Sequence, residues 1–192
     1  MSKMLVLDQD GVVIFQEKYF SKKYSEASGI PWEVILEFFN NEFKLTLVGK
    51  VSIKKVLPKY LKKWGWKGSL KSFLKYWFES ERTLDTRLLN YVTRLRKTGK
   101  RVCLSSVNEK ERESYIWNTL KLKNYFDKAY LSYELGCTKS DPKFFQKIIQ
   151  DFKIKPQDID YWDDDPKNVE VAKSVGINAK VYTSFEDFKK SV

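Results

Sequence analysis

Two carboxylates lie two positions apart near the start of the chain, directly after a short apolar run. Asp8 and Asp10 follow Met4–Leu7, and Gly11 behind them permits a tight turn. Because side chains two residues apart on an extended chain point to the same side, the two carboxylates would converge. Such a pair can supply a nucleophile, an acid or base, or oxygen ligands for a hard metal ion.

Three other polar groups follow apolar runs further along the chain. Hydroxyls occur at Ser105 and Ser106, and Lys139 precedes Pro142, where a helix can start. Three consecutive aspartates occupy 163–165, and their mutual repulsion calls for a metal ion or a lysine nearby. Each group taken alone also has an ordinary explanation: an acidic turn, a serine that caps a helix, or a solvent-exposed lysine.

The inventory of other reactive side chains is short. The 192 residues include no histidine, which excludes Ser-His-Asp and Cys-His machinery and any histidine general base. The two cysteines, Cys103 and Cys137, are too few for a Cys-rich zinc site. We expect both of them to be reduced thiols. Catalysis would therefore depend on carboxylates, hydroxyls, Lys or Arg, backbone amides, or a metal bound by oxygen.

The elements that position these groups can be predicted from the apolar pattern. Five short apolar runs predict buried strands at Met4–Leu7, Arg101–Ser105, Lys128–Ser132, Ile159–Trp162 and Ala179–Tyr182. Continuous rather than alternating apolarity is typical of strands covered on both faces, as in a parallel sheet. Helical patterns alternate with the later strands at Leu88–Lys97, Glu109–Leu120, Pro142–Phe152 and Asn168–Val175. The alternation predicts an α/β fold with a Rossmann-like parallel sheet, whose strand ends would bring the polar groups into one crevice.

Residues 15–86 break this alternation. They read as helical throughout, with no convincing strand, and apolar residues recur at steps of three and four, as at Leu70, Phe73, Leu74 and Trp77. We therefore expect a helical cap domain at 15–86, inserted into an α/β core domain made of 1–14 and 87–192. Both linkers would reach the core at the carboxyl end of the first strand, where open α/β sheets bind ligands.

The order Asp-x-Asp, Ser, Lys, Asp-Asp along nearly the whole chain resembles the haloacid dehalogenase superfamily of phosphatases and phosphotransferases. The matching motifs are Asp8-Gln9-Asp10-Gly11-Val12, Ser106 after an apolar strand, Lys139 three residues before Pro142, and Trp162-Asp163-Asp164-Asp165-Pro166-Lys167-Asn168. The helical insert after the first motif is similar to the cap of the subgroup that carries a helical bundle there. The resemblance implies that superfamily's fold and the activity of a phosphoric monoester hydrolase.

The resemblance also implies catalytic roles. Asp8 would attack the phosphoryl group and form an aspartyl-phosphate, and Asp10 would protonate the leaving oxygen and then activate water. Ser106, Val107 and Lys139 would bind the phosphoryl group, with Lys139 also neutralising Asp8. The superfamily's second motif often reads Thr-Asn, so Ser105 stays an adjacent candidate for the hydroxyl.

A magnesium ion is the cofactor that the resemblance implies. Asp8, the Asp10 carbonyl and Asp164 would hold it, helped by Asp163, in the all-oxygen environment that Mg²⁺ prefers. Asp165 stands where this subgroup often has serine, which leaves open which two of the three consecutive aspartates face the metal.

The sequence leaves three alternatives to phosphate hydrolysis. A phosphomutase or a haloacid dehalogenase would belong to the same superfamily, but dehalogenases lack the second aspartate because a halide needs no acid, so Asp10 favours phosphoryl transfer. A nucleic-acid-binding protein is the rival from another class, because the net charge is +11 and residues 15–87 carry +7 of it (15 Lys and Arg against 8 Asp and Glu). The helical spacing of the aromatic residues favours a cap core instead, with the charge steering a small phosphorylated substrate rather than a nucleic acid.

The start of the chain predicts its location. The segment MSKMLVLDQDG is not a signal peptide, because acidic residues follow the short apolar run almost at once. No apolar stretch approaches the roughly 18 residues that a membrane span requires. We expect a cytoplasmic protein that does not associate with membranes.

Overall fold

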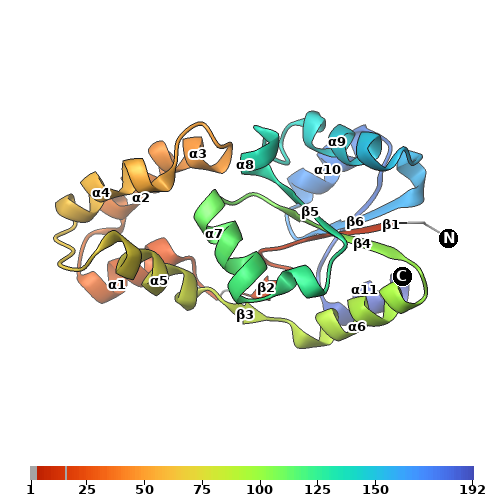
Figure 1. Ribbon diagram of the computed structural model, residues 1–192, viewed down its shortest axis with the longest axis horizontal. Helices are drawn as coiled ribbons and strands as arrows, with labels where there is room; N and C mark the ends of the chain where they lie inside the picture. Colours follow the sequence, from red (N-terminus) through yellow and green to blue (C-terminus); the bar gives the residue numbers. More distant parts are fainter. Residues whose placement is uncertain (1–3, 16) are drawn as a thin grey trace.

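A computed structural model describes residues 4–15 and 17–192, and a five-stranded parallel sheet lies at its centre (Figure 1). The strands are β1 (Met4–Asp8), β4 (Arg101–Ser106), β5 (Lys128–Leu131), β6 (Ile159–Asp163) and β7 (Asn178–Val181). They are arranged in the order β5-β4-β1-β6-β7, with every neighbouring pair parallel. The predicted strands are each confirmed to within one residue at either end, and so is the α/β fold.

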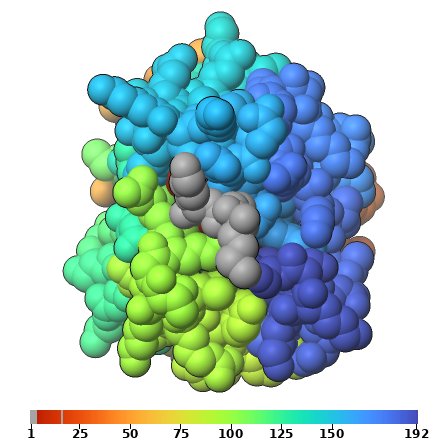
Figure 2. All heavy atoms as spheres, turned by 90° about the vertical axis from the view of Figure 1, so that its right-hand side faces the viewer, coloured from red at the N-terminus to blue at the C-terminus, as the bar shows by residue number. Residues whose placement is uncertain are grey.

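Helices cover both faces of this sheet, as the continuous apolar runs indicate. One face carries α6 (Thr86–Lys97) and α11 (Phe185–Ser191), and the other carries α9 (Pro142–Phe152) and α10 (Pro166–Ser174). The alternate residues of β1 divide between two apolar cores, Leu5 and Leu7 in the first and Met4 and Val6 in the second. Figure 2 shows the end of the molecule where α6, α9 and α11 come together. Because β1 runs from this end, the carboxyl ends of the parallel strands lie on the opposite side (Figure 1).

The segment after β4 differs from the single helix predicted for Glu109–Leu120. It begins as α7 (Lys110–Ser114), continues as a π-helical turn over Tyr115–Thr119, and a short 3₁₀ helix follows at Leu122–Asn124. Through the wide turn, Tyr115 packs against Phe78 with ring centroids 5.6 Å apart, while Ile116 is buried under the sheet. One more short helix, α8 (Ser132–Leu135), follows β5, and a 3₁₀ turn at Pro156–Asp158 precedes β6.

A separate group of helices lies beyond the carboxyl edge of the sheet (Figure 1). It comprises α1 (Phe20–Ser28), α2 (Trp32–Asn40), α3 (Glu42–Leu47), α4 (Ile53–Lys63) and α5 (Leu70–Ser80), and we call it the helical insert. Its core is its own and is dominated by aromatic side chains, among them Phe38, Trp64 and Phe73. No helix in the described ranges is long and apolar enough to cross a membrane.

The expectation that residues 15–86 contain no strand is wrong. β2 (Ile14–Phe15) pairs antiparallel with β3 (Thr83–Leu84), so the two linkers of the insert cross side by side as a short ribbon. The pairing gives the backbone N–H and C=O groups of the two linkers hydrogen-bond partners that they would otherwise lack. Two residues are too few to show a strand pattern in the sequence, so the pairing could not be predicted. The ribbon lies close to the boundaries predicted at 15 and 86, which stay a prediction.

Candidate active site

Five residues at the carboxyl edge form a buried, charged group that we call the Asp8 cluster: Asp8, Ser105, Lys139, Tyr161 and Asp163. The Lys139 ammonium donates to Asp8 Oδ1 and, over 2.9 Å, to Asp163 Oδ2, and the Tyr161 hydroxyl donates to the same Asp163 oxygen. Lys139 is 2% exposed and Asp163 is fully buried. A buried cation held between two carboxylates compensates both of them, which is what such charges require away from water.

The electrostatics of this cluster favour the charged forms of Lys139 and Asp163 and disfavour that of Asp8. Burial raises the pKa of Asp8, with Asp163 adding to the rise and Lys139 opposing it. Burial would lower the pKa of Lys139, but the two carboxylates outweigh it and hold that pKa above its ordinary value. Burial likewise would raise the pKa of Asp163, yet Lys139 and the Tyr161 hydroxyl lower it. Lys139 therefore stays protonated and carries a positive charge next to Asp8.

Asp163 has no oxygen left over for another partner. Besides Lys139 and Tyr161, its carboxylate accepts from the Asp165 backbone N–H at 2.8 Å and from Asn168 Nδ2 at 3.1 and 3.2 Å. These bonds fix the turn between β6 and α10 and aim Lys139 at Asp8. Asp163 is therefore placed to orient the Lys139 side chain.

Asp164 has the opposite character, because it faces Asp8 without a cation of its own. Carboxylate oxygens of Asp8, Asp163 and Asp164 all lie within 4.8 Å of one another, and Asp164 comes within hydrogen-bond reach of Asp8. Burial and Asp163 raise the pKa of Asp164. A Cβ at Gly11 would lie only 2.1 Å from Asp164 Oδ2, so the glycine is needed for this approach. Two facing carboxylates among hard oxygen donors fit a divalent ion such as Mg²⁺.

A second polar group occupies the opposite face of the same strand ends, and we call it the Glu113 cluster: Gln9, Asp10, Ser106, Asn108 and Glu113. Glu113 Oε1 accepts from the Ser106 hydroxyl and from Gln9 Nε2 at 3.1 Å, and Gln9 Nε2 also lies 3.0 Å from Ser106 Oγ. Asn108 donates to Ser106 Oγ at 3.1 Å and to Asp10 Oδ2. Burial raises the pKa of Glu113 to about 7.

The strand register decides which serine lies beside Asp8. Ser105 is the direct partner of Asp8 between β4 and β1, and paired residues of neighbouring strands project to the same face. The Ser105 hydroxyl donates to the Leu7 carbonyl at 3.2 Å, whereas the Ser106 hydroxyl donates to Glu113. The predicted hydroxyl, Ser106, therefore lies on the Glu113 side, and the adjacent candidate Ser105 lies on the Asp8 side, so the choice between them stays a prediction.

Arg112 is a site residue that the sequence reasoning missed. From α7 it donates to the carbonyls of Phe78, at 3.0 Å, and Glu81, and its guanidinium lies 3.9 Å from Asp10 Oδ1. The arginine therefore joins the end of α5 to the second carboxylate of the first motif. No local motif marks it, because its partners come from segments about 30 and 100 positions away.

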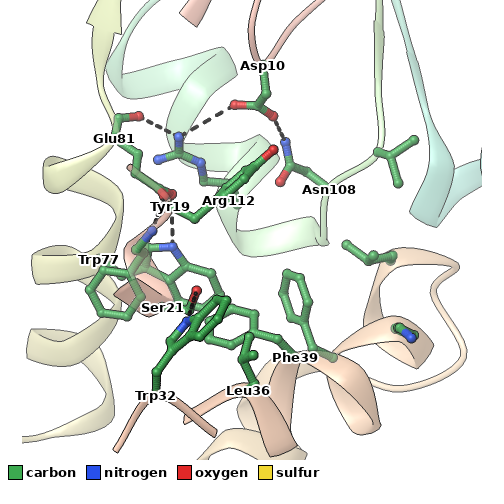
Figure 3. A pocket seen from close by; sticks show the side chains of 15 residues that line it. Asp10, Tyr19, Ser21, Trp32, Leu36, Phe39, Trp77, Glu81, Asn108 and Arg112 are labelled. Atoms are coloured by element: carbon green, nitrogen blue, oxygen red, sulfur yellow. Dashed lines mark hydrogen bonds and ion pairs between the residues drawn. The ribbon is translucent and has the colours of Figure 1, made fainter. Parts of the chain in front are cut away.

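Next to Asp10 a cavity of about 430 Å³ opens between the sheet edge and the helical insert (Figure 3). Asp10, Asn108 and Arg112 lie at one end, and Trp32 and Phe39 lie at the other. Val107, which sequence reasoning assigned to phosphate binding, is part of the wall on the Asp10 side. The predicted residues thus fall into two groups, one around Asp8 and one lining the mouth of this cavity.

Comparison with known proteins places this geometry in a family. A model described as haloacid dehalogenase-like hydrolase matches residues 14–181. D-ribitol-5-phosphate phosphatase of Bacteroides thetaiotaomicron is 31% identical over 105 residues, which are 52% of this chain and 51% of that protein, so the match spans about half of the relative's length. Phosphorylated carbohydrates phosphatase of Thermotoga maritima is 24% identical over 183 residues, 90% of this chain and 81% of that protein.

Solved structures agree with the fold. A HAD family enzyme of Bacteroides thetaiotaomicron has a TM-score of 0.84 at 23% identity, covering 99% of this chain and 98% of that one. The same enzyme has been solved in complex with magnesium and inorganic phosphate, and this form has a TM-score of 0.83 over 100% of this chain and 99% of that one, at 23% identity.

Proposed function

Because the chain belongs to the haloacid dehalogenase-like hydrolases, we propose that it is a Mg²⁺-dependent phosphatase of small phosphomonoesters. The observation that carries the proposal is the Asp8 cluster, a buried carboxylate clamped by Lys139 at the carboxyl edge of the sheet, with Asp10 at the mouth of a cavity beside it. The names of the two relatives, both phosphatases of phosphorylated polyols or carbohydrates, support the reaction type.

The reaction would proceed in two displacements on this geometry. An oxygen of Asp8 attacks phosphorus, the ester bond to the leaving oxygen breaks, and Asp10 gives that oxygen a proton. A water then attacks the aspartyl-phosphate while Asp10 takes its proton, which releases inorganic phosphate and restores the Asp8 carboxylate. Lys139 would offset the charge of the phosphoryl oxygens, and the Ser105 hydroxyl would donate to one of them.

The metal would be held by Asp8, Asp164 and the Asp10 carbonyl. When bound, Mg²⁺ supplies positive charge that lets an anionic ester approach an anionic carboxylate. Asp163 stays on Lys139, because its carboxylate already accepts from four partners in the described structure. Of the three consecutive aspartates, Asp163, Asp164 and Asp165, this assignment makes Asp164 the one metal ligand.

Among the alternatives within the superfamily, Asp10 argues for a hydrolase over a dehalogenase. Its carboxylate is held by Asn108 and lies near Arg112, at the point where a leaving group would emerge into the cavity. A halide leaving group would make no use of an acid there. Solved dehalogenases resemble the chain at 13–14% identity, which speaks for the fold alone.

Phosphate release from a panel of phosphomonoesters tests the proposal. We expect turnover with Mg²⁺ and none with EDTA, and we expect Asp8→Asn to reduce kcat by at least about 10³-fold, since it removes the attacking group. Asp151→Asn is the matched control, because Asp151 pairs with the surface lysines Lys128 and Lys147, and its activity should stay within about twofold. Equal activity of the Asp8→Asn protein would overturn the mechanism.

A magnesium titration separates the two acidic neighbours. Asp164→Asn should raise the Mg²⁺ concentration for half-maximal rate by about tenfold or more, because it removes a ligand. Asp163→Asn should shift that concentration much less. The reverse order would show that Asp163 is the ligand.

A further inference from the structure

The wall of the 430 Å³ cavity is apolar over most of its area, and its volume is that of a site for a small organic molecule. Around it are aromatic and aliphatic side chains from four helices of the insert and their linker: Tyr19, Phe20, Trp32, Leu36, Phe39, Phe43, Leu47 and Trp77. Figure 3 shows Trp32, Leu36 and Phe39 together at the end of the cavity away from Asp10. A group that leaves from phosphorus near Asp8 and is protonated by Asp10 would extend into this space.

The polar groups of the wall are already bonded to the protein. The Glu81 carboxylate accepts from the Phe20 backbone N–H and, at 3.0 Å, from Trp77 Nε1. The Ser21 hydroxyl accepts from Trp32 Nε1 at 3.4 Å. These bonds occupy the indole N–H groups of Trp32 and Trp77 and both carboxylate oxygens of Glu81.

Two other polar groups of the wall stay without a hydrogen-bond partner in the described structure. They are the Lys44 ammonium and the Tyr19 hydroxyl, on side chains that are both exposed. A polyol chain inside the cavity would lose its bonds to water and find few replacements, which costs free energy for each hydroxyl. An aromatic ring would instead gain burial and ring contacts against Trp32 and Phe39.

We propose, building on the phosphatase function above, that the preferred substrate is a phosphomonoester whose leaving group carries an aromatic ring, which binds among Trp32, Leu36 and Phe39. This substrate class differs from the phosphorylated polyols and carbohydrates named for the two relatives. Trp32 is a specificity-determining residue in this arrangement. It is 39% exposed, and Lys22 lies over its ring at 5.2 Å while its indole N–H is fixed on Ser21.

Benzyl phosphate and D-ribitol 5-phosphate form a matched test pair, because both are esters of a primary alcohol and differ in the body of the leaving group. We expect kcat/KM for benzyl phosphate to exceed that for D-ribitol 5-phosphate by at least about tenfold. Trp32→Ala should lower kcat/KM for benzyl phosphate by about tenfold, chiefly through KM. Acetyl phosphate, whose leaving group is too short to reach Trp32, should change by less than about twofold in the same variant.

Tyr76→Ala is the control for loss of an exposed aromatic side chain of the insert. Tyr76 is 38% exposed, close to Trp32, and lies outside the cavity wall. Its rates with all three substrates should match the unaltered protein. The proposal is overturned if D-ribitol 5-phosphate is used as well as or better than benzyl phosphate, or if Trp32→Ala affects acetyl phosphate and benzyl phosphate equally or leaves both unchanged.

Failure of the phosphatase function itself has a different signature, which is no Mg²⁺-dependent phosphate release from any of the three substrates. Isothermal titration of the Asp8→Asn protein with benzyl phosphate then tests the cavity without turnover. Saturable binding that Trp32→Ala weakens by about tenfold and Tyr76→Ala leaves unchanged supports the aromatic site. No binding, or binding indifferent to Trp32, contradicts it.

Discussion

The two polar clusters at the carboxyl edge lie back to back on β1 and β4, yet they handle buried charge in opposite ways. In the Asp8 cluster a lysine is clamped between two carboxylates and each acceptor of Asp163 is used. In the Glu113 cluster a carboxyl group is buried with amide and hydroxyl partners, and Gln9 Oε1 and Glu113 Oε2 have no hydrogen-bond partner in the described structure. One face favours the charged forms of Lys139 and Asp163, and the other favours the neutral form of Glu113.

The difference follows from the alternation of side chains along a strand. Asp8 and Gln9 are neighbours in sequence, as are Ser105 and Ser106, and each pair sends one member to either face. The face toward α9 and α10 receives Lys139, whereas the face toward α7 receives Glu113. A shift of one residue therefore moves a side chain from a charged environment to a nearly neutral one.

Removing the cation is the strongest way to break this contrast. Lys139→Met leaves Asp8 and Asp163 buried with no positive charge between them, and we expect a loss of about 3–5 kcal/mol in the free energy of unfolding. Urea unfolding without added metal measures the loss. Lys128→Met, which removes a surface partner of Asp151, should cost less than about 1 kcal/mol. A small loss for Lys139→Met, similar to the control, would show that the compensation is not needed.

The buried Glu113 carboxyl group should make the free energy of unfolding depend on pH. Since burial raises the folded-state pKa of Glu113 from 4.5 to about 7, the folded protein holds this proton more tightly than the unfolded chain. The contribution of this proton to the free energy of unfolding is complete below pH 4.5 and is lost as the pH rises through 7.

Glu113→Gln removes this titration and keeps the shape of the side chain. Between pH 5 and 8 the unaltered protein should lose about 2 kcal/mol of unfolding free energy more than the variant does. Chemical denaturation at several pH values measures the difference. Parallel pH profiles for the two proteins would mean that Glu113 titrates normally in the folded state.

The smallest effect separates the two serines. Ser105→Ala should lower kcat/KM by about tenfold, because it removes a hydroxyl beside Asp8 that can donate to a charged phosphoryl oxygen. Ser106→Ala should stay within about threefold, because that hydroxyl serves Glu113 on the other face. The opposite order would restore Ser106 as the phosphate-binding hydroxyl and would require the end of β4 to turn over on substrate binding.

Sequence reasoning was most successful where a single strand carries the information. The five strands, the parallel sheet and membership of the superfamily are confirmed, because apolar runs and the polar residues behind them are local signals. The choice between Ser105 and Ser106 was not local, because it depends on how β4 registers against β1. Arg112 and Glu113 were missed for the same reason, since their partners are distant in sequence.

The aromatic residues of the insert show how far periodicity reaches. Their helical spacing predicted a cap core, and Phe38, Trp64 and Phe73 are indeed buried together. Trp32 and Phe39 follow the same spacing on α2 but line the cavity. Periodicity identifies the apolar side of a helix, whereas only the arrangement of neighbouring helices determines whether that side meets protein or an open space.

The ribbon of β2 and β3 limits how the two parts of the molecule can rotate against each other. Two separate linkers would act as independent tethers, whereas two paired strands twist and bend together. Arg112 donates to the carbonyls of Phe78 and Glu81 at the end of α5, and its guanidinium lies 3.9 Å from Asp10. A movement that separates the end of α5 from α7 would therefore break the arginine's bonds to these carbonyls or pull its charge away from Asp10.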